Sequence, residues 1–87
     1  MEYYIKNENI EWQVLQDESV LLNVETGFYF RLNLLGTIVW EMCDGSNAKG
    51  EIVNYIANSF NISVERAEKD VNDFLTQMLA NDLIKLK

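Results

Sequence analysis

The amino-acid sequence predicts an α+β fold, in which a three-stranded antiparallel β-meander is followed by three helices in a winged-helix-like arrangement. Two observations predict it. Short runs of alternating apolar and polar residues between positions 12 and 32 are typical of half-buried strands. From position 34 onward, apolar residues recur every three or four positions, which is typical of amphipathic helices. The helices have to cover one face of the sheet, because its apolar side chains need a partner layer.

Residues 12–32 supply the three strands. Trp12 to Gln16 form the first strand, and Asp17-Glu18-Ser19 is the turn after it. The next two strands form a hairpin across Glu25-Thr26-Gly27, where the glycine can take the left-handed conformation of a short loop. The alternating apolar residues of this hairpin are Val20, Leu22 and Val24 before the turn, and Phe28, Phe30 and Leu32 after it.

The first eleven residues show no clean period, so we treat residues 1–11 as a separate N-terminal segment. Its Tyr3, Tyr4 and Ile5 either add a strand or pack over an edge. Residues 12–87 then form a single domain. The 87-residue chain is 48% hydrophobic. A chain of this size buries about 60–65% of the surface that its unfolded form exposes, which is enough for one core.

Three helices follow the hairpin. Asn33 suits the N-cap of the first, which ends at Asp44-Gly45, and Ser46 to Gly50 supply capping chemistry for the second. Ser63 caps the third, which ends at Asn81-Asp82, and residues 83–87 can continue as a short tail strand. The apolar faces are Leu35, Ile38, Val39 and Met42 in the first helix, Ile52, Val53, Ile56, Ala57 and Phe60 in the second, and Val64, Ala67, Val71, Phe74, Leu75, Met78 and Leu79 in the third.

The charge balance bounds the choice of partner. Fourteen acidic residues against seven basic ones give a formal net charge of −7. Such a chain repels phosphate backbones, which disfavours nucleic acid as a ligand. The apolar stretches are shorter than the roughly 20 residues of a membrane span, and the acidic N-terminal residues are unlike a signal peptide. We therefore expect a cytoplasmic protein without a membrane partner.

The chain lacks the side chains of common catalytic and metal sites. It has no histidine and one cysteine, and no nucleotide-binding or nucleophile motif is present. We expect Cys43 to be a core residue rather than a reactive thiol. Carboxylates cluster along the third predicted helix, but they are best interpreted as its solvated face. The sequence thus predicts a protein without catalysis, metal or cofactor.

The last strand of the meander, Phe28 to Leu32, lies at an edge if spatial order follows chain order. Its outer side then carries unpaired N–H and C=O groups. In one interpretation Arg31 guards this edge against aggregation and Tyr29 is a cross-strand partner. In the other, the edge binds an extended peptide by β-augmentation, for which a run with three aromatic residues and no proline is a good template.

The chain from about Trp12 to Ile84 resembles the pyrroloquinoline quinone biosynthesis protein D (PqqD) family, whose members recognise the leaders of ribosomally made, modified peptides. The matching segments are VLLN and TGFYFRLN in the strands, LLGTIVWEMCDG in the first helix, EIV in the second, and DVNDFLTQMLANDLI at the end. The turn VETGFYF resembles the stand-alone recognition elements of lasso-peptide clusters more than the quinone-pathway proteins.

The resemblance implies a non-catalytic adaptor. It would bind the leader of a precursor peptide as an added strand and present it to a separate modifying enzyme, such as a leader peptidase with a cyclase. Carried onto this sequence, the peptide-binding groove has two walls. They are formed by Phe28, Tyr29, Phe30, Arg31 and Leu32 on the strand, and by Ala67, Asp70, Val71, Phe74 and Met78 on the third helix.

Two other functions remain open from the residues alone. A winged-helix DNA-binding regulator is also a small domain with three helices, but Arg66 and Lys69 face an excess of acidic residues on the third helix. A dimeric structural subunit would pair the same strand edge with a second copy of the chain.

Overall fold

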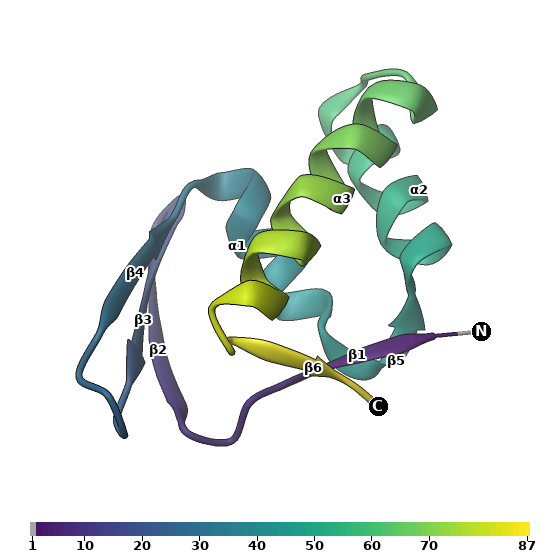
Figure 1. The fold of residues 1–87 in the computed structure, drawn as a ribbon. Coiled ribbons are helices and arrows are strands. Elements are labelled where there is room, and N and C mark those ends of the chain that lie inside the picture. Colours follow the sequence, from purple (N-terminus) through teal and green to yellow (C-terminus); the bar gives the residue numbers. More distant parts are fainter. Residues whose placement is uncertain (1) are drawn as a thin grey trace.

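Figure 1 shows the computed structural model of the chain, which describes residues 2–87. The strands form two antiparallel three-stranded sheets, in the spatial orders β5-β1-β6 and β2-β3-β4. Helix α1 contacts both sheets, and α3 crosses in front of it (Figure 1). The elements in chain order are β1 (Tyr3–Lys6), β2 (Ile10–Leu15), β3 (Glu18–Asn23), β4 (Tyr29–Leu32), α1 (Leu34–Met42), β5 (Asp44–Ala48), α2 (Lys49–Phe60), α3 (Val64–Ala80) and β6 (Ile84–Leu86).

The β2-β3-β4 sheet confirms the predicted meander and the order of its strands. Gly27 has a φ of +81°, so it takes the left-handed conformation that the hairpin turn requires. The Asn23 carboxamide oxygen accepts hydrogen bonds from the N–H groups of Glu25 and Thr26, which closes this turn. Val24 lies in the turn rather than in the strand, and it is exposed.

The prediction for the buried face of β3 was wrong. Leu21 is fully buried, whereas Val20 and Leu22 are half-buried on the opposite face. Leu21 shares the inner face with Ser19 and Asn23, and both of these polar residues are buried. Ser19 is tolerated there because its hydroxyl hydrogen-bonds the hydroxyl of Thr37 on α1 at 2.8 Å. The buried face of β3 thus carries one apolar and two polar residues, so hydropathy alone predicts the opposite face.

The second sheet was not predicted. Asp44-Gly45 is predicted to end the first helix and Ser46 to Gly50 to cap the second, but Asp44–Ala48 forms strand β5 and pairs with β1 through Tyr3 and Ala48. The N-terminal segment adds a strand, which was one of its two predicted outcomes. Strand β6 confirms the predicted tail strand and pairs with the other side of β1, with Ile5 opposite Lys85. Both ends of the chain are therefore attached to one small sheet.

The predicted helix starts are confirmed at Asn33 and Ser63, whose side chains accept hydrogen bonds from Gly36 N and Arg66 N. Helix α2 begins after Ala48, which has no side-chain acceptor; the Glu51 carboxylate compensates by accepting the Ala48 N–H at 2.8 Å. The inner face of α2 is as predicted, with Phe60 partly buried.

The buried faces of the other two helices differ in part from prediction. In α1 the buried face is rotated, because Thr37 and Trp40 are buried beside Val39, while Leu35, Ile38 and Met42 are partly buried. In α3 the predicted stripe holds from Ala67 to Leu79, but Val64 at its start is exposed.

Lys6 of β1 joins the two sheets at the C-terminal end of α1. Its Nζ lies 5.4 Å from the centre of the Trp12 ring and 5.2 Å from that of Trp40. The same amino group donates hydrogen bonds to the carbonyl oxygens of Glu41 and Cys43, where a helix end favours a positive charge. The two indoles pack edge to face, with centroids 5.4 Å apart.

Leu21→Ala tests which face of β3 is buried. We expect it to lower the free energy of unfolding by about 2–5 kcal/mol, because Leu21 is fully buried and truncation leaves a cavity. The matched control is Leu15→Ala, because Leu15 is 51% exposed and should change stability by no more than about 0.5 kcal/mol. Urea denaturation measures both changes, and equal losses would contradict the observed face.

Candidate functional site

Strand β4 is an edge strand, because among residues 2–87 it pairs with β3 alone. The N–H of Asn23 donates to the carbonyl of Phe28, and the register continues from this pair with Leu21 opposite Phe30. Hydrogen-bonding direction alternates along an antiparallel strand. Phe30 and Leu32 therefore point their main-chain groups toward β3. Tyr29 and Arg31 present theirs to the open edge.

The side chains of β4 also divide into two rows. Phe30 is partly buried and Leu32 is buried, and both pack with the core. Tyr29 and Arg31 are exposed and lie on the opposite face of the sheet, since strand side chains alternate. The row of Phe30 and Leu32 is therefore the one that faces the helices.

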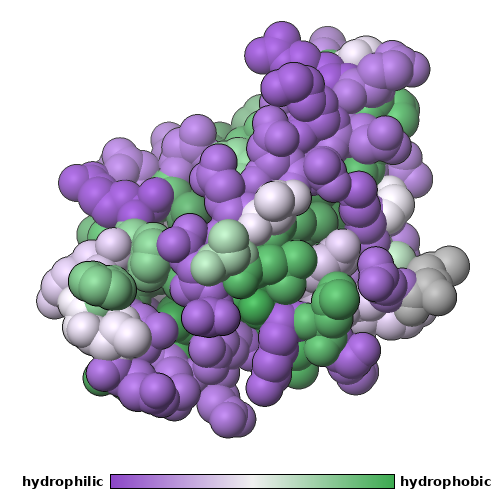
Figure 2. Space-filling view, viewed as in Figure 1, coloured by the Kyte–Doolittle hydropathy of each residue, from purple (hydrophilic) through white to green (hydrophobic). Residues whose placement is uncertain are grey.

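A hollow of about 110 Å³ lies between β4 and the C-terminal half of α3. It is lined by Phe30, Arg31, Leu32, Phe74, Gln77, Met78, Asn81 and Leu83. A second hollow of about 210 Å³ shares Phe30 and Asn81 with the first and extends to Phe28 and Thr26 at the hairpin turn. We call these two adjoining hollows the β4 groove. Figure 2 shows hydrophobic side chains gathered around the end of α3, on a surface that is otherwise largely hydrophilic.

Gly36 of α1 fixes how closely the two walls of the β4 groove approach. A Cβ atom at this position would lie 2.7 Å from Cε1 of Phe74 and 3.3 Å from Cβ of Leu32. Phe74 belongs to α3 and Leu32 to β4, so both walls of the groove pack against α1 at Gly36. Any side chain at position 36 would have to displace the Phe74 ring.

The structure brings together part of the predicted site. Phe30, Arg31, Leu32, Phe74 and Met78 all line the first hollow. Phe28 borders the second, and Tyr29 lies outside both, although its main chain forms the open edge. Arg31 forms an ion pair with Glu18 of β3 at 2.8 Å.

Three predicted residues lie away from the groove, in the N-terminal half of α3. Ala67 and Val71 have no exposed surface, so their side chains pack in the core under α3. Asp70 forms an ion pair with Arg66 at 3.7 Å. The groove instead includes Gln77, Asn81 and Leu83, which were not predicted. Gln77 and Asn81 follow Phe74 at three and seven positions, a spacing that places them on one helical face and was available in the sequence.

Cys43 belongs to the hydrophobic core. Cys43 is buried, as predicted, and burial raises the pKa of its thiol to about 12, so the nucleophilic thiolate is disfavoured near neutral pH. Within residues 2–87, no group of three or more His, Cys, Asp or Glu side chains is placed to hold a metal ion. In the same residues, no helix has the length and apolarity needed to cross a membrane.

The cations of α3 are engaged by neighbouring carboxylates. Arg66 is paired with Asp70, and Lys69 with Asp73 at 3.4 Å. Each pair lies four residues apart on the exposed surface of the helix. A DNA-recognition helix instead directs its cations at phosphates and base edges.

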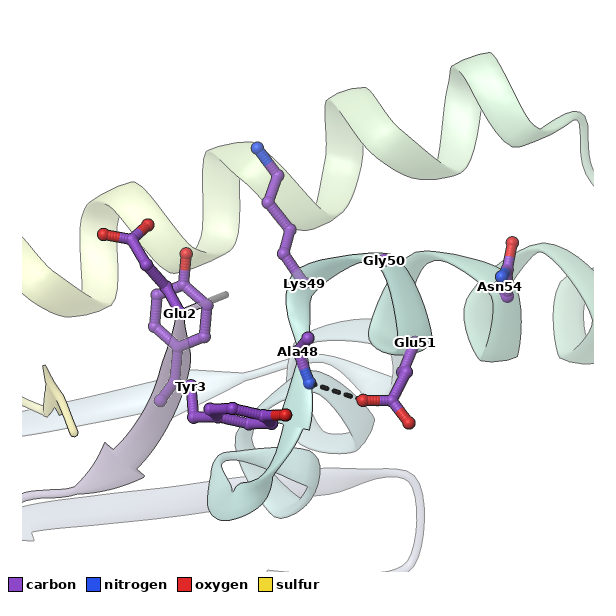
Figure 3. A pocket seen from close by; sticks show the side chains of 8 residues that line it. Glu2, Tyr3, Ala48, Lys49, Gly50, Glu51 and Asn54 are labelled. Carbon is purple, nitrogen blue, oxygen red and sulfur yellow. Dashed lines mark hydrogen bonds between the residues drawn. The ribbon is translucent and has the colours of Figure 1, made fainter.

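A larger hollow of about 550 Å³ lies at the other end of the molecule, where β1, β5 and α2 meet (Figure 3). Two of its charged side chains already form hydrogen bonds within the protein. Glu51 caps α2 through Ala48 N, and Lys49 Nζ donates to Asn72 Oδ1 on α3 at 2.6 Å. We therefore consider the β4 groove, with its open main-chain edge, the better candidate site.

Comparisons with known proteins identify the family and the fold. The family model described as coenzyme PQQ synthesis protein D (PqqD) matches residues 18–84. A solved structure of TbiB1 in complex with the TbiA(beta) leader peptide is 27% identical, with a TM-score of 0.85 over 93% of this chain and 94% of that one. Lasso peptide synthetase B1 complexed with the leader peptide is 16% identical and shares the fold, with a TM-score of 0.84 over 94% and 96% of the chains. No curated protein matches the chain.

Gly36→Ala tests the packing that sets the groove. Displacing the Phe74 ring costs about 1–3 kcal/mol, whereas alanine favours the helix by about 0.5–1 kcal/mol, so we expect the free energy of unfolding to fall by up to about 2 kcal/mol. Gly50→Ala is the matched control, because a Cβ there meets nothing within 4 Å and alanine favours a helix by about 0.5–1 kcal/mol. Urea denaturation should give opposite signs for the two variants. A stabilising Gly36→Ala would refute the packing argument.

Proposed function

We propose that this chain, which belongs to the PqqD family, binds the leader segment of a ribosomally made precursor peptide as an added strand on β4. The observation that carries the proposal is the open edge of β4 beside the β4 groove. Tyr29 and Arg31 supply main-chain donors and acceptors at this edge, and Phe30, Leu32 and Phe74 supply apolar surface next to it.

The similar structures support this assignment. TbiB1 and lasso peptide synthetase B1 were both solved with leader peptides, and each match covers more than nine tenths of both chains. These matches favour a stand-alone recognition element of the lasso-peptide type over a DNA-binding regulator, whose recognition helix would need free cations.

The geometry constrains the peptide that fits. An added strand alternates its side chains, so one row enters the β4 groove and the other lies beside Tyr29 and Arg31. The inward row meets Phe30, Leu32 and Phe74, which favours apolar leader residues at alternate positions. The outward row meets an exposed aromatic ring and an arginine already paired with Glu18.

The adaptor role also explains what the chain lacks. Its sequence has no histidine, and its one cysteine is buried with a raised pKa. We therefore assign the chemistry to a separate enzyme, such as a leader peptidase, to which this chain presents the precursor. The chain needs no cofactor for this role, and its main-chain edge gives affinity while the groove gives sequence preference.

Titration of the isotope-labelled protein with the leader of the precursor encoded beside its gene tests the proposal. We expect saturable amide shifts in the two-dimensional NMR spectrum, concentrated in residues 28–32 and 74–83, because these line the groove. Shifts confined to the hollow at β1 and α2 would contradict the site. A silent spectrum from the folded protein would contradict leader binding.

Variants at Arg31 separate the main chain from the side chain in the same titration. Arg31→Pro removes an N–H that faces the open edge and is not used by the β3 ladder, and proline is tolerated on edge strands. We expect leader affinity to fall roughly three- to tenfold, as for the loss of one hydrogen bond. Arg31→Ala, the matched control, keeps the N–H. Equal losses in both variants would contradict strand addition.

A further inference from the structure

The outer face of the β2-β3-β4 sheet is open to solvent and partly apolar. Figure 1 shows this sheet standing to one side of the helices, which lie against its inner face only. The register places Glu11, Leu22 and Tyr29 side by side on the outer face, and Gln13, Val20 and Arg31 beside them. Leu15 is 51% exposed and Tyr29 is 69% exposed. A solvated sheet face is normally polar, so these apolar residues call for an explanation.

The outer face contains a shallow hollow and an acidic side chain, that of Glu11. A shallow hollow of about 230 Å³ lies at its centre, lined by Glu11, Trp12, Gln13, Val20, Leu22 and Tyr29. Arg31 is neutralised by Glu18, whereas Glu11 has no ionic partner among the described residues. The face therefore favours a partner that brings an apolar side chain to the hollow and a basic one to Glu11.

The size of the face limits the kind of partner. Strands β2 and β3 have six residues each and β4 has four, so at about 3.3 Å per residue and a spacing of about 4.8 Å they cover on the order of 250 Å². A stable interface buries about 800 Å² per partner, so two copies joined through this face alone fall well short. A transient partner that also contacts neighbouring surface fits better. The nearest neighbouring surface is the edge of β4, because Tyr29 belongs to both the face and the edge strand.

We propose that this outer face is a docking surface for the enzyme that processes the bound precursor, and that it is separate from the β4 groove. The inference rests on the proposed function. An enzyme docked on this face would lie next to a leader strand added to β4, without covering the groove side of that strand. The same small sheet would then hold the peptide along its edge and the enzyme on its outer side.

A double variant and its matched control test the docking surface. Glu11→Lys with Leu15→Asn alters the outer face outside the groove. Glu68→Lys with Val64→Asn makes the same change of charge on α3, where Val64 is also 51% exposed. Leader affinity is measured by fluorescence anisotropy with the labelled leader, and enzyme affinity by interferometry with the purified peptide-modifying enzyme encoded beside this chain.

We expect the face variant to weaken enzyme binding at least tenfold and to leave leader affinity within twofold. The α3 variant should leave both within twofold. Unchanged enzyme binding by the face variant would overturn the proposal, and so would an equal loss of leader affinity, which would assign the face to the peptide site. Wild-type dimers that the face variant dissociates in sedimentation would also overturn it. Failure of the wild-type protein to bind leader would instead contradict the proposed function itself.

Discussion

The close approach of three elements at Gly36 is the constraint on which the groove depends. Because α1 has no side chain at this position, the Phe74 ring of α3 and the Leu32 side chain of β4 both pack against its backbone. This contact fixes the distance between the edge strand and the helix beside it. It thereby creates a slot with main-chain hydrogen-bonding groups on one wall and an apolar surface on the other. A wider spacing would leave an ordinary exposed edge, and a narrower one would exclude a peptide.

The second sheet packs at the other end of α1. Strand β1 pairs with β5 on one side and with β6 on the other, and Lys6 connects that sheet to α1 and to the indoles of Trp12 and Trp40. The β2-β3-β4 sheet is then held from one side, through its inner face, and its β4 edge and outer face stay open. The same three strands thus present two open surfaces, an edge that we propose binds the leader and a face that we propose binds the enzyme.

Local signals in the sequence predicted the meander and the three helices, because Gly27, Asn33 and Ser63 each act on their immediate neighbours. The β5-β1-β6 sheet escaped prediction, since its strands are short, lie far apart in the chain and include Asp44–Ala48, which has the composition of a turn. The buried face of β3 was misassigned because Ser19 and Asn23 are buried through hydrogen bonds that hydropathy does not register. Of the predicted strand residues, Phe28, Phe30, Arg31 and Leu32 line the two hollows, and their role in peptide binding stays a prediction. On the helix side, the crossing of α3 and β4 determines whether the N-terminal half of α3, with Ala67, or the C-terminal half, with Asn81, lies beside the strand. The apolar pattern of one helix does not encode this crossing.

Amide hydrogen exchange in β4 tests the central claim most directly, which is that an added strand completes this edge. In the free protein, the N–H groups of Phe30 and Leu32 face β3 and should exchange slowly, whereas those of Tyr29 and Arg31 face solvent and should exchange fast. Saturating leader peptide should slow Tyr29 and Arg31 to the rates of their neighbours, because their N–H groups then donate to the peptide. Fast exchange at both residues in the saturated complex would show that the leader binds elsewhere and would contradict strand addition at β4.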